Sequence, residues 1–202
     1  MSSNELAPVA QPNAAHPAER RKFIPKPAGI VVYASVILCI MAAKAAVLFL
    51  MGNDVVCPCG VQLWLNDSTG AENSKHIADW YSVSHVLAGM LFAGVMWLTS
   101  RRWPLGWMIV AAAAFSAGWE VIENTPWIIS QFGNTRVGAN YTGDTILNSL
   151  FDSAFVMAGF VAALRLPLVV SIGLVVLAEV VSAFMIGDSL VLATVRFVVG
   201  LF

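Results

Sequence analysis

Five long apolar runs restrict what this chain can fold into. They cover residues 29–51, 80–100, 105–123, 145–164 and 168–186. Each run is about 20 residues long, the length that an α-helix needs to cross the hydrocarbon core of a bilayer. A sixth apolar segment, residues 189–202, is shorter, contains Arg196 and follows a break at Gly187-Asp188, so we interpret it as a re-entrant or interfacial helix.

The amino-acid composition supports the same interpretation. Of the 202 residues, 58% are hydrophobic and only 11% are charged, which leaves too little polar surface to cover a soluble globule. The sequence therefore predicts an all-α, polytopic transmembrane bundle with about five spans and a short C-terminal apolar helix. A net charge of −1 gives no electrostatic reason to expect a nucleic-acid partner, and membrane lipids are the expected surroundings.

The sequence divides into two parts. Residues 1–28 are rich in Ala, Pro, Ser and Asn and cannot bury much apolar surface, so they are predicted to form a disordered cytoplasmic tail. Residues 29–202 are predicted to form the transmembrane domain. The alternative for the first run is a cleaved signal peptide, but signal sequences have apolar cores of about 7–15 residues, and this run is longer.

The positions of the basic residues predict the orientation. They precede the first run and also occupy the second–third and fourth–fifth connections: Arg20, Arg21, Lys22 and Lys26; Arg101 and Arg102; and Arg165. The positive-inside rule places all three groups in the cytoplasm, together with the N-terminus. The connections 52–79 and 124–144, which carry few basic residues, then face outward.

Given that orientation, strongly polar residues gather in the outer leaflet. Four spans deliver His85, Glu120, Glu123, Asp144, Asn148, Asp152 and Glu179 to this side. A carboxylate at membrane depth costs several kcal/mol unless it is paired or hydrated, so such a group indicates a ligand site, a pathway or a compensating partner. The sequence is compatible with a functional pocket on the outer side or with a purely structural polar network.

The spacing of these residues restricts the chemistry. Asp144, Asn148 and Asp152 are four residues apart and would share one helix face, but about 12 Å of helical rise separates the two aspartates. That separation disfavours an aspartic dyad on this helix. Glu120 and Glu123 share a face, and two carboxylates so close raise the pKa of one of them unless a cation lies nearby.

Three candidates could supply that positive charge: His85, Arg136 or a divalent metal ion. The sequence has no HExxH or comparable spacing, so a metal and any other cofactor remain unknown at this stage. His85, Gly89 and Ala93 place small residues on one face of the second span, which predicts close packing with a neighbouring helix.

The cysteines give little information on function. Cys39 lies in an apolar run, whereas Cys57 and Cys59 flank Pro58 in the first outward connection. A bridge between residues so close in sequence is expected to be strained, so the motif predicts a turn, with thiol chemistry as the alternative.

Several longer motifs carry a family resemblance. They are Cys57-Pro58-Cys59-Gly60; residues 72–81, which read ENSKHIADWY, with Ser84-His85; Trp119-Glu120-Val121-Ile122-Glu123-Asn124; and residues 141–149, which read YTGDTILNS, with Asp152. Over about residues 52–188, the chain resembles alphaproteobacterial inner-membrane proteins grouped as a domain of unknown function. That resemblance implies a location in the bacterial inner membrane but no particular activity.

A more distant resemblance concerns the order of the polar residues. A His on one helix, a Glu at the end of the next, an Arg in the loop and an Asp-x-x-x-Asn pattern are similar to the VanZ-like membrane proteins, a family linked by its name to glycopeptide tolerance. Family members often have a second His where this chain has Ala88, and an Arg-Asp-Asn where it has Gly187-Asp188-Ser189. A role that needs two histidines is therefore not expected.

These observations lead to a functional hypothesis with an open alternative. The preferred hypothesis is a pocket on the periplasmic side that binds or acts on a lipid-linked substrate of the cell envelope. If the protein is an enzyme, His85, Glu120, Glu123 and Asp144 would be catalytic, while Arg136, Asn148 and Asp152 would bind substrate. The alternative is a non-catalytic membrane factor that binds lipid or partner proteins, in which the polar residues are structural.

The orientation can be tested with reporter fusions. Reporters fused after Arg102 or Arg165 are expected to be cytoplasmic, and reporters inserted near Ser68 or Asn134 periplasmic. The measurement is the activity of a reporter that works on only one side of the membrane. Reversal at two of these four points would contradict the assignment of the polar residues to the outer leaflet.

Overall fold

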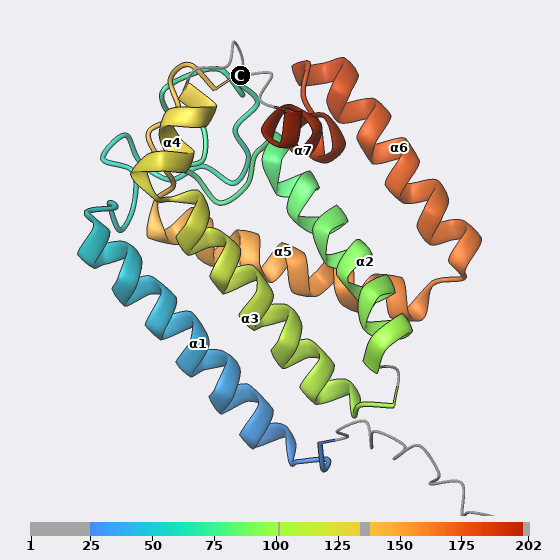
Figure 1. Ribbon diagram of the computed structural model, residues 1–202. Helices are drawn as coiled ribbons and strands as arrows, with labels where there is room; N and C mark the ends of the chain where they lie inside the picture. The colour runs from blue at the N-terminus through green and yellow to red at the C-terminus, as the bar shows by residue number, and fades with distance from the viewer. Residues whose placement is uncertain (1–24, 101, 134–137, 200–202) are drawn as a thin grey trace, which may run out of the picture.

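The computed structural model describes residues 25–100, 102–133 and 138–199, and the structural statements below refer to these residues. The described chain forms seven helices and no strand (Figure 1). They are α1 (Ile30–Met51), α2 (Trp80–Ser100), α3 (Leu105–Glu123), α4 (Pro126–Gly133), α5 (Ile146–Arg165), α6 (Leu168–Ile186) and α7 (Leu190–Val199). The all-α fold class is therefore confirmed.

Five of these helices, α1, α2, α3, α5 and α6, are long and apolar enough to cross a membrane. Their ends agree with the five predicted runs to within one residue. The C-terminal helix α7 has ten described residues, which span about 15 Å and cannot cross a bilayer. It folds back against α2 and α6, as the prediction of a short C-terminal apolar helix requires.

Local sequence signals explain where the shorter elements begin and end. The helix α4, which the sequence reading missed, starts with Pro126, a residue whose fixed φ suits the first helical position. Helix α6 ends at Gly187, whose φ of 69° lies in the left-handed region that favours glycine. The chain can then turn sharply and begin α7 at Leu190.

One prediction about the fourth span was wrong. Asp144 does not lie on the helix with Asn148 and Asp152, because α5 begins only at Ile146. Thr145 caps this helix: its backbone is extended, and its Oγ1 accepts a hydrogen bond from the backbone N–H of Asn148 at 3.2 Å. The predicted three-residue stripe is therefore limited to Asn148 and Asp152.

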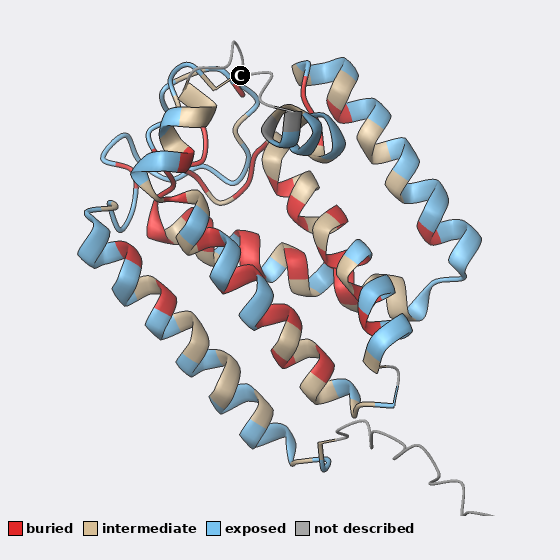
Figure 2. Ribbon diagram, in the orientation of Figure 1, coloured by how far each residue is buried: buried red, intermediate tan, exposed pale blue. Residues whose placement is uncertain are grey.

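Helix α5 is the centre of the bundle. Helices α1, α2, α3 and α6 all contact it, and α1 also packs along α3 (Figure 1). Figure 2 shows that buried residues concentrate on α2, α3 and α5 and on the loops at one end, whereas α1 and α6 are largely exposed. On α6, Leu168 and Phe184 are 75% and 87% exposed, as expected for side chains that face lipid.

Both long connections lie at one end of the bundle, which we call the loop end (Figure 1). It comprises residues 52–79 and 124–145, including α4. Backbone N–H groups of Ile146 and Leu147, in the first turn of α5, donate to the carbonyls of Asp54 and Val55 at 2.9 and 3.1 Å. The first connection is thus held directly on the start of α5.

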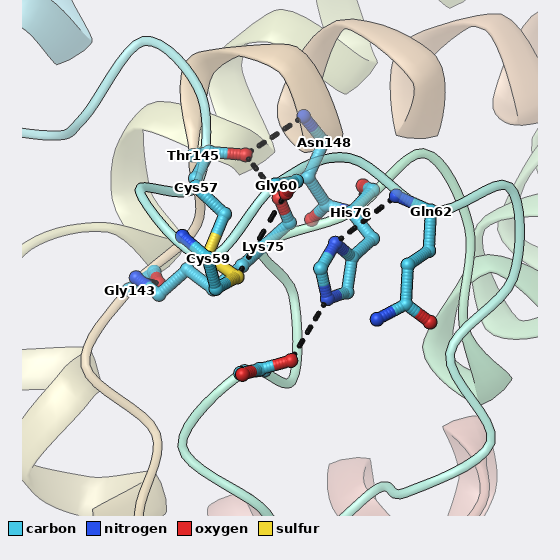
Figure 3. Close-up of a disulfide and its surroundings, with 10 residues drawn as sticks. Cys57, Cys59, Gly60, Gln62, Lys75, His76, Gly143, Thr145 and Asn148 are labelled. Atoms are coloured by element: carbon cyan, nitrogen blue, oxygen red, sulfur yellow. Dashed lines mark hydrogen bonds and ion pairs between the residues drawn. A yellow bond between two sulfur atoms is a disulfide. The ribbon is translucent and has the colours of Figure 1, made fainter.

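The structure corrects the expectation for Cys57 and Cys59. The two residues form a disulfide, with their Cα atoms 5.1 Å apart, in a tight turn of the first connection (Figure 3). The expected strain does not prevent the bridge, because the turn itself brings the Cα atoms into the range that disulfides span. Gly60, which follows with a φ of 103°, lets the chain leave this turn.

Close contact between α2 and α5 determines how the core packs. A Cβ atom added to Gly89 would lie 2.0 Å from the backbone oxygen of Val156, and one added to Gly159 would lie 2.0 Å from that of Val86. Each helix therefore uses a glycine to accept the backbone of the other. The close packing predicted from His85, Gly89 and Ala93 is confirmed for Gly89.

This contact predicts the effect of a single added methyl group. Gly89→Ala and Gly159→Ala are each expected to lower the free energy of unfolding by about 2 kcal/mol or more, because backbone must move to admit the new Cβ. The measurement is the thermal unfolding of the detergent-purified protein. Gly94→Ala is the matched control, since it lies on α2 with open space around its Cα. Equal destabilisation by all three variants would contradict the packing.

Candidate functional site

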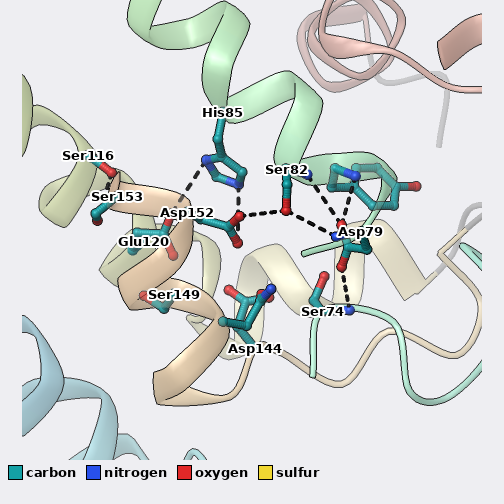
Figure 4. A network of polar contacts seen from close by, with 12 residues as sticks. Ser74, Asp79, Ser82, His85, Ser116, Glu120, Asp144, Ser149, Asp152 and Ser153 are labelled. Carbon is teal, nitrogen blue, oxygen red and sulfur yellow. Dashed lines mark hydrogen bonds and ion pairs between the residues drawn. The ribbon is translucent and has the colours of Figure 1, made fainter. Parts of the chain in front are cut away.

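His85 connects three helices at the loop end. It lies on α2 and is 9% exposed. Its Nδ1 is 3.5 Å from Oε1 of Glu120 on α3, and its Nε2 is 3.8 Å from Oδ2 of Asp152 on α5 (Figure 4). Both separations exceed a normal hydrogen bond but allow an ion pair. Helices α2, α3 and α5 contact one another, so polar residues of three spans meet here.

Glu120 and Glu123 bring two carboxylates to the same place. They are three residues apart on α3, and one ligand atom each of His85, Glu120 and Glu123 lies within 4.8 Å of the others. Glu120 is fully buried, and neither of its oxygens has a hydrogen-bond partner among the described residues. We call His85, Glu120, Glu123 and Asp152 the acid–histidine cluster.

Asp152 is held in place by a chain of hydrogen bonds. Ser82 Oγ donates to Oδ1 of Asp152 at 2.9 Å and accepts from the backbone N–H of Asp79 at 3.1 Å. Asp79 in turn caps α2, because its carboxylate accepts from the backbone N–H of Tyr81 at 2.8 Å. Burial raises the pKa of Asp79, and these backbone hydrogen bonds offset part of that rise.

Sequence reasoning missed a buried cation. Lys44 on α1 is 3% exposed, and its ammonium group donates to the backbone oxygen of Ser149 at 2.6 Å and to Oγ of Ser153 at 2.7 Å. Ser116 Oγ also donates to Ser153 Oγ, at 2.9 Å, which links α1, α5 and α3 beside the cluster. The available signal was a lone lysine inside an otherwise apolar span.

Asp144 makes its hydrogen bonds outside the cluster. Its carboxylate accepts from the Asn124 amide and from the Tyr141 hydroxyl, the latter at 3.0 Å, and its backbone N–H donates to Oδ1 of Asn124 at 2.7 Å. Burial raises the pKa of Asp144, and the hydrogen bonds from Asn124 and Tyr141 offset only part of that rise. The catalytic role of Asp144 stays a prediction.

Asn148 and Arg136 are the two remaining predicted residues, and of these only Asn148 is among the described residues. Asn148 donates from Nδ2 to the backbone oxygen of His76 at 2.9 Å, so it ties α5 to the first connection. His76 was expected in a loop and lies there, but it is fully buried, which the sequence did not indicate. Arg136 lies outside the described residues, and its role also stays a prediction.

A cavity of about 310 Å³ adjoins the cluster. It lies among α2, α3, α4 and α7, with Val156 of α5 at its wall. His85 and Glu123 line it together with aromatic side chains: Tyr81, Phe115, Trp119, Phe132 and Tyr141. A molecule in this cavity would meet apolar rings over most of its surface and a histidine with a carboxylate at one side.

The geometry of the cluster permits two kinds of chemistry. A histidine between carboxylates can exchange protons with a bound molecule, because one carboxylate orients the ring and stabilises its charged form. The same donor set, one imidazole nitrogen with carboxylate oxygens, can bind a metal ion. For either kind of chemistry a bound molecule must reach the cluster from the cavity, and His85 and Glu123 line that cavity.

Fold and site together define the class: a helical bundle with five membrane-spanning helices and an acid–histidine cluster at one end. The comparison with protein families is consistent with this class and adds a family. Residues 48–201 match the family described as "Protein of unknown function (DUF2585)", and the chain belongs to that family. The match extends beyond the predicted range of residues 52–188 and includes the segment of α7.

Similar proteins occur in several alphaproteobacteria. A UPF0314 protein of Rhizobium etli (strain CIAT 652) is 36% identical over 154 residues, which cover 76% of this chain and 79% of that protein. The UPF0314 protein of Sphingopyxis alaskensis is 38% identical over 156 residues, covering 76% of this chain and 82% of the relative. The resemblance to an alphaproteobacterial family of unknown function is confirmed, and the likeness to VanZ-like proteins stays a resemblance. No solved structure matches the chain.

The raised pKa of Asp144 predicts a pH effect on stability. The pKa of an aspartate in an unfolded chain is about 3.9. A carboxyl group whose pKa is higher in the folded protein stabilises the fold below that pH, and this contribution is lost as the pH rises through the folded pKa. The melting temperature of the wild type, minus that of Asp144→Asn, should therefore fall from about pH 4 to about pH 8.

Asp67 supplies the control of opposite sign. Hydrogen bonds from Thr69 lower the pKa of this exposed carboxylate, so its contribution is present at neutral pH and is lost as the pH falls. The difference between wild type and Asp67→Asn should thus not fall as the pH rises. A difference for Asp144→Asn that is independent of pH would contradict the assigned shift.

Proposed function

We propose that this protein resides in the bacterial inner membrane with a cytoplasmic N-terminus, and that it binds and acts on a lipid-linked substrate of the cell envelope. The distribution of Arg and Lys among the connections supports this orientation, which puts the loop end on the periplasmic side. The acid–histidine cluster then lies where envelope substrates are accessible.

The cavity carries the proposal. A lipid-linked molecule has an apolar chain and a polar head, and the cavity offers aromatic walls with His85 and Glu123 at one side. Phe115 and Trp119 line the cavity and are also 43% and 41% exposed, so these walls reach the surface of α3. A substrate could therefore enter from the lipid phase without leaving the membrane.

The cluster supplies the reactive groups in this proposal. His85 would exchange a proton with the substrate or with a water molecule, and Glu120 or Glu123 would orient and balance the ring. Asp152, held by Ser82, would fix the opposite nitrogen of the ring. Arg136 would contact an anionic headgroup, and Asp144 with Asn148 would position substrate or water.

The rival proposal is a non-catalytic membrane factor with a purely structural polar network. One observation favours it: Asp79, Asp144 and Asn148 all form hydrogen bonds with residues of the loop end, namely Ser74, Asn124 and His76. These contacts support folding whether or not a reaction occurs. The two proposals differ for His85, which only an enzyme would need as a proton carrier.

Mass spectrometry of envelope lipids separates the two. A deletion strain is expected to accumulate an altered lipid-linked component that wild-type protein removes and His85→Gln does not, because loss of general acid–base catalysis slows turnover by about 100-fold or more. Glu179→Gln is the matched control: it changes a membrane glutamate outside the cluster and keeps an oxygen that can accept from the backbone N–H of Val191.

The amount of folded protein must be compared for each variant. If His85→Gln is present in the membrane at the wild-type level and restores the lipid profile fully, catalysis by His85 is excluded. If the deletion strain shows no altered component at all, the non-catalytic factor is the better account.

A further inference from the structure

We propose that the acid–histidine cluster binds a divalent transition-metal ion, such as Zn²⁺ or Mn²⁺, through Nδ1 of His85 and the carboxylates of Glu120 and Glu123. These residues come from α2 and α3, and their ligand atoms lie within 4.8 Å of one another. Two ligands that are each about 2.1 Å from a tetrahedral ion are about 3.4 Å apart. The separation of 3.5 Å between His85 Nδ1 and Glu120 Oε1 fits this requirement.

The position of the His85 ring supplies the first argument. Its Nδ1 faces Glu120 at 3.5 Å and its Nε2 faces Asp152 at 3.8 Å, and both separations exceed a normal hydrogen bond. Asp152 Oδ1 accepts a hydrogen bond from Ser82, whereas Glu120 accepts none from the described residues. A cation between Nδ1 of His85 and Glu120 would be bound by both groups.

The burial of the glutamates supplies the second argument. Glu120 is fully buried, and both of its oxygens, together with Oε2 of Glu123, have no hydrogen-bond partner among the described residues. Glu123 accepts a side-chain hydrogen bond from Trp119, and Glu120 has only His85 within ion-pair distance. Burying two adjacent ionised carboxylates with so few partners costs several kcal/mol. One protonated histidine offsets a single negative charge, whereas a divalent ion offsets both.

Nearby protein cations do not replace this ion in the described structure. Lys44 is the one buried lysine among the described residues, and its ammonium donates to Ser149 and Ser153 rather than to a cluster carboxylate. Among the described residues, no lysine or arginine lies within ion-pair distance of Glu120 or Glu123.

The surroundings of His85 provide the third argument. Metal-binding histidines usually direct the second ring nitrogen at a carboxylate or carbonyl group that fixes the ring orientation. Asp152 has this position, and Ser82 and the start of α2 hold it there. Because His85 and Glu123 line the cavity, an ion at the cluster would keep a coordination position open to a bound molecule.

A second group of possible ligands does not meet these requirements. Cys59, Glu72 and His76 lie close together in the first connection, but Cys59 is bonded to Cys57 and offers no thiolate. His76 and Glu72 also pair directly, at 3.3 Å. The cluster at His85 is therefore the site assigned to the metal.

Metal binding can be measured directly on the full-length protein in detergent. After removal of bound metals, the wild type is expected to take up about one Zn²⁺ or Mn²⁺ per chain, as counted by elemental mass spectrometry. Glu120→Gln and Glu123→Gln should each weaken uptake by more than about 10-fold, and Asp152→Asn by about 10-fold to 100-fold. Glu179→Gln, outside the cluster, should bind as the wild type does.

Size-exclusion chromatography and the melting temperature monitor folding. Addition of the metal should raise the melting temperature of the wild type and of Glu179→Gln but not that of Glu123→Gln. Glu123 is only partly buried, so its variant provides the test even if Glu120→Gln does not fold. The proposal is overturned if the wild type binds neither ion, or if Glu123→Gln binds as tightly as the wild type.

This proposal uses the same cluster as the proposed lipid chemistry, but it does not depend on the substrate. Metal uptake is measured without any lipid substrate, and the lipid profile of the deletion strain is measured without reference to metal. A cluster that binds metal in a strain with normal lipids would refute the proposed reaction alone. An altered lipid profile with a metal-free protein would refute the metal site alone.

Discussion

The contact between α2 and α5 is the feature on which the rest of the structure depends. Gly89 and Gly159 let the two backbones approach to a distance that any larger residue would prevent. His85 lies one turn before Gly89, and Asp152 lies two turns before Gly159, so the same contact brings an imidazole and a carboxylate together across the interface. Without the contact between α2 and α5, His85 and Asp152 would each lose the other as the partner that offsets its desolvation.

The second constraint is the cost of burying charge in an apolar bundle. The structure meets this cost differently at different carboxylates. Asp79 and Asp144 accept hydrogen bonds from groups of the loop end, the backbone N–H of Ser74 and the hydroxyl of Tyr141, as structural groups do. Both oxygens of Glu120 and Oε2 of Glu123 accept no hydrogen bond among the described residues, although Glu123 does accept one from Trp119. This difference separates the groups that hold the fold from those available for a ligand.

The sequence predicted the spans well because length and hydropathy determine which segments can be buried in lipid. It located His85, Glu120 and Asp152 correctly at one end, since helix order and alternating topology suffice for that. It could not place Asp144, because whether a helix begins before or after it depends on the cap at Thr145. Lys44 was missed because it lies at a single position in an otherwise apolar run, and its partners are more than 100 residues away.

Lys44 also shows how the bundle distributes its positive charge. Its ammonium is satisfied by a backbone oxygen and a serine on α5, so α1 is fixed to the helix that carries Asp152. A lysine bound directly to Glu120 would offset one of the negative charges of the cluster and occupy the position that a ligand would take. Because Lys44 is bound to Ser149 and Ser153, the fold keeps a positive charge near the cluster without occupying the oxygens of Glu120.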